Sequence, residues 1–348
     1  MDPGNVAANV SAGAQYGFLL VWVILLANAM AALVQYLSAK LGLVTGRSLP
    51  EAVGDRMRRP ARLAYWVQAE LVAMATDLAE VVGGSLALHL LFGCPLLVGG
   101  VITGIVSLLL LMVADRRGQR VFERVISGLL LIIAIGFLTS LFVNPPPIGD
   151  VVAGMIPRFR GTESVLLATA MIGATVMPHA VYLHSGLARD RHGNPQGRRR
   201  ALLLRVTKAD VGFAMVVAGA VNIAMLLVAA TNLQGRHDTD SIEGAHAAVR
   251  EALGPTVALL FAIGLLASGL ASTSVGAYAG AMVMSGLLRR SIPLLLRRLI
   301  TLVPALAILA IGLDPTRALV FSQVVLSFGI PFALIPLVRL TSDGSLGA

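Results

Sequence analysis

Long apolar stretches, separated by short polar or arginine-rich stretches, dominate this sequence. Apolar runs of helix length occupy residues 17–41, 62–92, 95–114, 122–143, 164–188, 207–231, 255–287, 294–312 and 317–339. A helix of about 20 apolar residues crosses the hydrocarbon core of a bilayer, and the longer run at 62–92 is predicted to tilt or to extend beyond it. A short helix at 5–16 and a polar surface helix from Ser241 to Leu253 are also predicted. The pattern predicts an all-α polytopic membrane protein.

The composition argues against a soluble protein and against several classes of function. Only 13% of the 348 residues are charged, whereas soluble domains contain about 25%. The net charge of +9 does not indicate nucleic-acid binding, because the basic residues are not interleaved with aromatic ones. The single cysteine, Cys94, leaves no partner for an internal disulfide. No phosphate-binding loop and no Ser/His/Asp arrangement is present, so we expect no enzyme, no cofactor and no obligate protein partner.

The basic residues lie mainly in alternate loops. Of the 27 Lys and Arg residues, 22 lie within 40–62, 116–124, 189–208 and 289–298 or at 339, and only 5 lie in the loops between these. Cytoplasmic loops of membrane proteins carry an excess of Lys and Arg. The distribution therefore predicts a multi-pass protein of the cytoplasmic membrane whose basic loops face the cytoplasm.

Two short breaks that contain proline interrupt the apolar sequence, MDPGN at 1–5 and ATVMPH at 174–179. Pro3 and Pro178 are 175 residues apart, which is half the chain. Proline lacks a backbone N–H, and at membrane depth the polar groups it frees are tolerated only where they line a cavity or bind something. Matched broken helices in the two halves of a chain indicate the central site of a transporter. The side chains of Asp2, Asn5 and Met177 in these breaks are potential metal ligands.

Four segments resemble the Nramp family of proton-coupled divalent-metal transporters. MDPGNVAANVSAGAQYG and MIGATVMPHAVYLHSGL resemble its first and sixth helices, and ATDLAEVVGG and FSQVVLSFGIPFALIP its third and tenth. The resemblance implies one transmembrane domain over 1–348 with a LeuT-type fold. In that fold two inverted five-helix repeats, here 1–143 and 164–340, contain discontinuous first and sixth helices. The expected function is proton-coupled import of Mn²⁺, Fe²⁺ and similar transition metal ions.

The resemblance also implies a metal site between the first and sixth helices at mid-membrane. Asp2, Asn5 and the Ala174 carbonyl would supply oxygen ligands, and Met177 a thioether sulfur. Oxygen ligands alone suit Mg²⁺ and Ca²⁺, whereas sulfur favours softer transition metals, so Met177 would discriminate against the hard cations. A glutamine of the family's tenth helix maps onto Gln323 as a further ligand. The alternatives are packing for Met177 and an interhelical hydrogen bond for Gln323.

Three carboxylates on one helix indicate a proton route. Glu70, Asp77 and Glu80 are spaced i, i+7 and i+10, which places them on one helix face, and buried carboxylates in a membrane require a water path or partner cations. The family's proton exit resembles this arrangement and includes an arginine pair that maps onto Arg297 and Arg298. The alternatives are an interfacial charge for Glu70 and an ordinary positive flank for the arginines.

Two histidines follow the second break. His179 comes directly after Pro178, and its titration range suits proton transfer. His184 would point about 140° away from it on a regular helix, and it is either a relay group or a core histidine bonded to the backbone.

The sequence departs from the family in several places. Ala8 and Ala180 stand where the family usually has threonine and asparagine, which removes two hydrogen-bonding groups near the expected site. The sequence also lacks the half-helix that precedes the first motif and ends after the tenth helix. Two explanations of the missing half-helix stay open, a start further upstream or a truncated, inactive product. A symporter of a small organic solute on the same fold, or a non-transporting membrane protein, are the alternative functions.

Overall fold

The computed structural model describes residues 2–113, scattered positions between 128 and 142, and residues 144–236, 241–289 and 292–342. The predicted span at 122–143 therefore lies largely outside the described residues. The described elements are all helices: α1 (Pro3–Tyr16), α2 (Val21–Thr45), α3 (Leu49–Gly54), α4 (Arg59–Phe92), α5 (Leu96–Val113), α7 (Ile148–Ala153), α8 (Gly161–Val176), α9 (Pro178–His192), α10 (Gly197–Asn232), α11 (Ile242–Leu253), α12 (Pro255–Leu288), α13 (Leu294–Ile311) and α14 (Pro315–Ser342).

Several described helices are long and apolar enough to cross a membrane. Six segments meet this criterion: Val21–Thr45, Arg59–Phe92, Gly161–His192, Gly197–Asn232, Pro255–Leu288 and Pro315–Ser342. α4 has 34 residues, which at 1.5 Å per residue corresponds to about 51 Å and exceeds the roughly 30 Å hydrocarbon core. The prediction that the 62–92 run is too long for a straight span agrees with this length.

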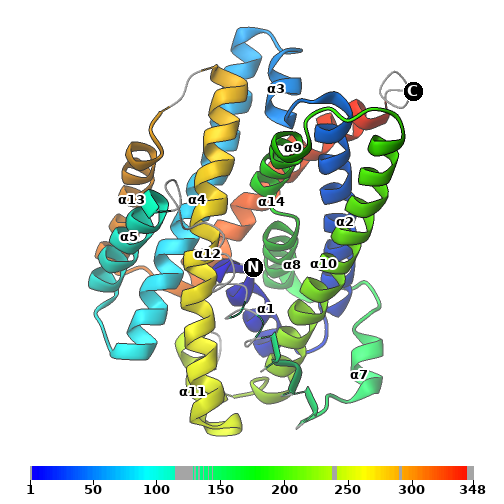
Figure 1. Ribbon diagram of the computed structural model, residues 1–348. Helices are drawn as coiled ribbons and strands as arrows, with labels where there is room; N and C mark the ends of the chain where they lie inside the picture. The colour runs from blue at the N-terminus through cyan, green and yellow to red at the C-terminus, as the bar shows by residue number, and fades with distance from the viewer. Residues whose placement is uncertain are drawn as a thin grey trace.

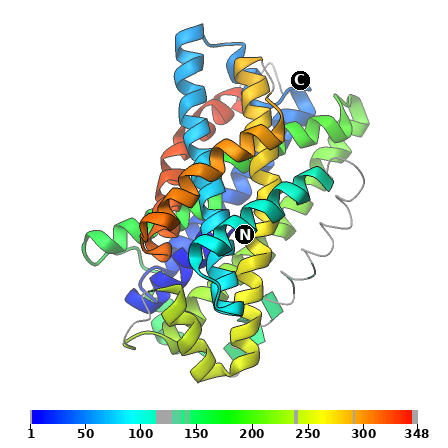
Figure 2. The same ribbon diagram turned by 90° about the vertical axis from the view of Figure 1, so that its left-hand side faces the viewer.

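The helices form a bundle around a buried α1 (Figures 1 and 2). α4 and α12 run side by side through the bundle, α5 and α13 pack together at one edge, and α2 and α10 pair at the other. The N-terminal end of α1 lies in the interior in both views. Every residue of α1 from Pro3 to Ala14 is buried, which is typical of a helix enclosed by other helices on all sides.

Local sequence signals explain where the helices begin and end. α1 begins at the Asp2 cap with Pro3 in its first turn, where the missing N–H costs nothing. α4 ends at Gly93, whose φ of 67° is readily adopted only by glycine. α3 begins with a capping box, in which Ser48 and Glu51 each accept a hydrogen bond from the other's backbone N–H.

Candidate metal centre and its neighbouring charges

The break between α8 and α9 consists of Met177 alone. Its backbone has a φ of 51° and a ψ of 81°, so it is left-handed, ends α8 and precedes Pro178, the first residue of α9. On a continuous helix the Ala174 carbonyl would accept from the N–H of residue 178, which proline lacks. Among the described residues no backbone N–H donates to the Ala174 carbonyl. The break therefore leaves a buried carbonyl oxygen free, beside a half-buried thioether.

Asp2 presents a carboxylate oxygen with no partner in the interior of the bundle. One oxygen, Oδ1, accepts from the Asn5 backbone N–H at 2.7 Å and caps α1. The other, Oδ2, has no hydrogen-bond partner among the described residues, although Asp2 is fully buried. A buried charged oxygen without a partner is costly, so the site fits a bound cation.

A chain of buried amides fixes the orientation of the Asn5 side chain. The Asn5 Nδ2 donates to the Asn222 Oδ1 at 2.8 Å, and the Asn9 Nδ2 donates to the Asn5 Oδ1 at 3.1 Å. Since an amide has two donors on nitrogen and two lone pairs on oxygen, these bonds leave the Asn5 oxygen one lone pair. Asn222 lies on α10 and is not among the site residues predicted from the sequence.

Gln323 of α14 lies against the start of α1. A Cβ placed on Gly4 would lie 1.9 Å from the Gln323 Nε2, so only glycine lets the amide approach this closely. A Cβ on Gly173 of α8 would lie 2.1 Å from the Gln323 carbonyl oxygen. The side-chain Oε1 of the fully buried Gln323 has no partner among the described residues. Its amide nitrogen donates to Ser322 on the same helix at 3.1 Å, and its side chain also interacts with Asp2 at the start of α1.

A buried arginine bridges two of the three predicted carboxylates. The Arg298 Nη1 lies 2.6 Å from the Asp77 Oδ1, and its Nη2 lies 2.9 Å from the Glu80 Oε2. The three side chains are at most 1% exposed. The Arg298 Nε also donates to Ser107 of α5 at 3.2 Å. Two carboxylates and one guanidinium leave this cluster with one excess negative charge when both acids are ionised.

The second arginine, Arg297, forms an ion pair with Glu70, which lies nearer the N-terminal end of α4 than Asp77 and Glu80. The Arg297 Nη2 lies 2.7 Å from the Glu70 Oε1, with the arginine 5% and the glutamate 17% exposed. A Cβ on Gly280 of α12 would lie 2.0 Å from the Arg297 Cζ, so this glycine makes room for the guanidinium. Both arginines are buried and paired, which argues against an ordinary positive flank and against a plain interfacial Glu70.

The two histidines lie in different surroundings. The Nδ1 of buried His179 lies 3.3 Å from the Thr76 Oγ1, and its Nε2 has no partner among the described residues. Thr76 precedes Asp77 on α4. His179 therefore lies between the break at Met177 and the helix that carries the three predicted carboxylates. His184 instead pairs through Nδ1 with the Gln35 Oε1 of α2 at 2.6 Å. The structure thus does not place His184 with the other proposed proton groups.

Comparison with known proteins identifies the family. The family profile described as "Natural resistance-associated macrophage protein-like" (Nramp) matches residues 1–347. The chain belongs to the Nramp family. It is 72% identical over 344 residues to the "Divalent metal cation transporter MntH" of Mycobacterium tuberculosis H37Rv, covering 99% of this chain and 80% of the relative. The protein of the same name from Deinococcus radiodurans is 46% identical, with 98% and 79% covered.

Solved structures agree with the Nramp assignment and with the predicted fold class. The manganese transporter of Eremococcus coleocola superposes with a TM-score of 0.86 at 30% identity, covering 99% of this chain and 77% of that one. Mhp1, a nucleobase-cation-symport-1 family transporter, has a TM-score of 0.64 at 15% identity, covering 97% and 77%, which speaks for the fold alone. Both neighbours have the LeuT-type fold, so the predicted fold class is confirmed.

The Nramp chain brings most of the predicted site residues into two neighbouring groups. One group lies at the two breaks, with Gln323 of α14, and the other joins α4 to α13 through the two arginines. Thr76 and Asn222 are not among the site residues predicted from the sequence. A signal for Asn222 was present, because it is a lone amide within the apolar run 207–231. Among the described residues no three or more His, Cys, Asp or Glu side chains form a metal cluster.

Proposed function

We propose that this Nramp chain transports divalent transition metal ions such as Mn²⁺ and Fe²⁺ together with protons, and that it is an importer. The observation that carries the proposal is the unpartnered Asp2 oxygen in the fully buried start of α1. A divalent cation satisfies such an oxygen, and the helix break offers it further neutral ligands. The family and the names of the relatives support the same conclusion.

The proposed ligands are Asp2, Asn5, Gln323, Met177 and the Ala174 carbonyl. The one carboxylate lowers the charge of the bound ion only partly, and the neutral oxygens complete its coordination. The thioether of Met177 prefers softer metals over Mg²⁺ and Ca²⁺. An organic carboxylate would instead favour free N–H groups at helix N-termini, and the Asp2 carboxylate would repel it.

The proposed proton route starts at His179 and continues to the cluster formed by Asp77, Glu80 and Arg298. A single proton taken up by the two carboxylates neutralises this cluster, because Arg298 balances the other negative charge. From there the ion pair of Glu70 and Arg297 extends the path along α4 toward the arginine-rich side. We propose no relay role for His184, because its ring bonds Gln35 on the opposite side of α9.

Separate groups for the metal and the proton explain how the two cargoes move in the same direction. A proton bound at the metal ligands would compete with the metal, whereas one bound at Asp77 or Glu80 leaves Asp2 ionised. His179 lies next to both groups, so a change in the charge of one group affects the other through it. We also propose that the two repeats are 1–143 and 164–340 and that the arginine-rich loops are cytoplasmic.

Release into the cytoplasm requires a closed contact on the arginine-rich side to open. The Tyr65 hydroxyl of α4 lies 3.0 Å from the Tyr182 hydroxyl of α9. It also donates to the Phe332 carbonyl of α14. These hydrogen bonds join α4, α9 and α14 near the second break. We propose that the bonds break and the three helices separate as the metal leaves.

Metal uptake into proteoliposomes tests the function. We expect Mn²⁺ to accumulate faster when the outside is acidic, and we expect Asp2→Asn to abolish uptake because it removes the only charged ligand. Arg158→Gln, at an exposed loop position, serves as a control that keeps uptake. Uptake that is equal with and without the pH gradient would refute proton coupling. Uptake by Asp2→Asn at the control rate would refute the metal site.

A further inference from the structure

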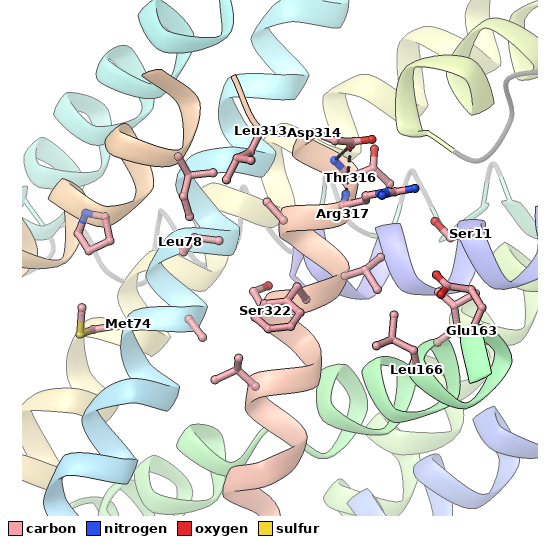
Figure 3. Close-up of a pocket in the computed structure, with 18 of the residues that line it drawn as sticks. Ser11, Met74, Leu78, Glu163, Leu166, Leu313, Asp314, Thr316, Arg317 and Ser322 are labelled. Carbon is pink, nitrogen blue, oxygen red and sulfur yellow. Dashed lines mark hydrogen bonds between the residues drawn. The ribbon is translucent and has the colours of Figure 1, made fainter. Parts of the chain in front are cut away.

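A large groove opens on the side of the bundle opposite the arginine-rich loops and extends inward to Ser322, which contacts the proposed metal ligand Gln323. It has a volume of about 1310 Å³ and is lined by residues of α1, α4, α8, α13 and α14 (Figure 3). Its apolar wall includes Leu71, Met74 and Leu78 of α4 and Phe321 of α14. Leu71 and Phe321 are 55% and 63% exposed, so this wall is open to an apolar occupant.

The groove is about as deep as one leaflet of a bilayer. Its lining residues on α14 extend from the cap at Asp314 to Val325, which at 1.5 Å per residue spans about 16 Å. Half of the roughly 30 Å hydrocarbon core is about 15 Å. An acyl chain lying along α14 would therefore reach from the membrane surface to the deep end of the groove.

Charged residues gather at the shallow end. Asp314 caps α14 through its Oδ1, which accepts from the backbone N–H groups of Thr316 at 2.8 Å and Arg317 at 3.1 Å. The guanidinium of Arg317 is exposed and forms no ion pair with the carboxylates that the structure describes. In the view of Figure 3, Asp314 lies above Arg317 and Glu163 of α8 lies below it. One cation and two carboxylates thus line this end of the groove.

We propose that this groove binds one phospholipid with a primary ammonium headgroup, of the phosphatidylethanolamine type. The acyl chain lies along the wall formed by Leu71 and Phe321. The phosphate lies at Arg317, which can donate to it in a bidentate manner. The ammonium lies at Glu163 or Asp314. The groove is lined by one cation and two carboxylates, and the charge of Glu243 on α11 also interacts with Asp314, so a headgroup with only a negative charge is disfavoured.

The occupant would influence transport because α14 also carries Gln323, two residues beyond Phe321. This consequence rests on the proposed function, but the binding site itself does not. The experiment therefore measures lipid retention rather than metal uptake, so a failure of one does not imply a failure of the other.

Native mass spectrometry of the purified, detergent-solubilised chain tests the proposal, because it measures which lipids the chain retains. The probes are phosphatidylethanolamine and phosphatidylglycerol with identical acyl chains, added as an equal mixture. We expect the wild-type chain to retain one phosphatidylethanolamine in several-fold excess over phosphatidylglycerol. Arg317→Gln should lower this retention about fivefold, the effect of about one basic residue at a membrane surface.

Two further variants separate the headgroup from the acyl chain. Glu163→Gln removes a carboxylate and should shift the preference toward phosphatidylglycerol. Ala318→Phe fills the groove and should reduce the retention of both lipids. Arg250→Gln, an exposed position on α11 outside the groove, is the matched control and should behave as wild type.

Two results would overturn the proposal. Equal retention of the two lipids by the wild-type chain means that the groove does not select an ammonium headgroup. Unchanged retention in both Arg317→Gln and Ala318→Phe, with intact folding by circular dichroism, means that the retained lipid lies elsewhere.

Discussion

Replacing Gly4 with alanine should displace Gln323 while leaving the fold intact. The added Cβ would lie 1.9 Å from the Gln323 Nε2 and 2.4 Å from its Cδ. Ordinary contacts of this kind are about 3.5 Å, so the amide has to move by about 1.6 Å. The clash is with the far end of a flexible side chain, and α1 has helical geometry at Gly4. The helix preference for alanine over glycine offsets part of the cost of moving the buried amide, so the loss of stability should be small.

The consequence for the metal should be large. A misplacement of about 1 Å in a positioned group commonly costs about 100-fold, so we expect the Kd for Mn²⁺ to rise between tenfold and 100-fold. Isothermal titration calorimetry on the purified chain measures this Kd, and thermal unfolding measures stability on the same sample. Gly212→Ala on α10 is the matched control, because no heavy atom lies within 4 Å of its added Cβ.

A double-mutant cycle identifies the cause of the loss. If Gly4→Ala acts through Gln323, then adding it to Gln323→Ala should change the Kd little, because neighbouring residues that share one effect are not additive. Wild-type affinity in Gly4→Ala, or additive losses in the double variant, would refute the assignment of Gln323 as a ligand.

Three further predictions concern other parts of the structure. Met177→Ala should lower several-fold the Ca²⁺ concentration that inhibits Mn²⁺ uptake, because the soft ligand is lost. A radiotracer uptake assay measures this, and an unchanged inhibitory Ca²⁺ concentration contradicts it. Arg298→Met should destabilise the chain by about 3–5 kcal/mol in denaturant unfolding, because it leaves two buried carboxylates without their partner, and a loss under 1 kcal/mol argues against the cluster. Burial tends to raise the pKa of the Glu51 carboxyl, but hydrogen bonds from the Ser48 backbone and from Arg189 outweigh this, so the pKa lies below its ordinary value of 4.5. The ionised Glu51 carboxylate therefore stabilises the fold above pH 4.5, and this stabilisation is lost as the pH falls through the lowered pKa. Glu51→Gln should therefore make the melting temperature fall less steeply on acidification. A fall as steep as in the wild-type chain contradicts this.

The sequence predicted the features that depend on local chemistry. Proline at 178 lacks an N–H wherever it stands, so the break at Met177 could be predicted without knowing the neighbouring helices. The spacing of Asp77 and Glu80 places both carboxylates on one face of a helix, and both contact Arg298. The apolar runs predicted the long helices that the structure describes, with α4 among the longest, but not the short helices α3 and α7.

Features that depend on packing between distant segments could not be predicted. Sequence alone could not distinguish Arg297 and Arg298 from a basic flank, since their burial results from the packing of α13 on α4 and α5. The bond between Asn5 and Asn222 joins residues 217 positions apart, so no local pattern indicates it. Likewise, the choice between a core and a relay role for His184 depended on Gln35 of α2.

The most direct test of coupled metal and proton transport measures both cargoes in the same proteoliposomes. A metal-sensitive dye and a pH-sensitive dye report the lumen after Mn²⁺ is added outside, with the membrane potential clamped at zero and no initial pH gradient. We predict that Mn²⁺ entry acidifies the lumen, and that Glu80→Gln allows metal entry with much less acidification because the proton cluster loses a carboxylate. Metal entry without any acidification by the wild-type chain would contradict the account, as would undiminished acidification in Glu80→Gln.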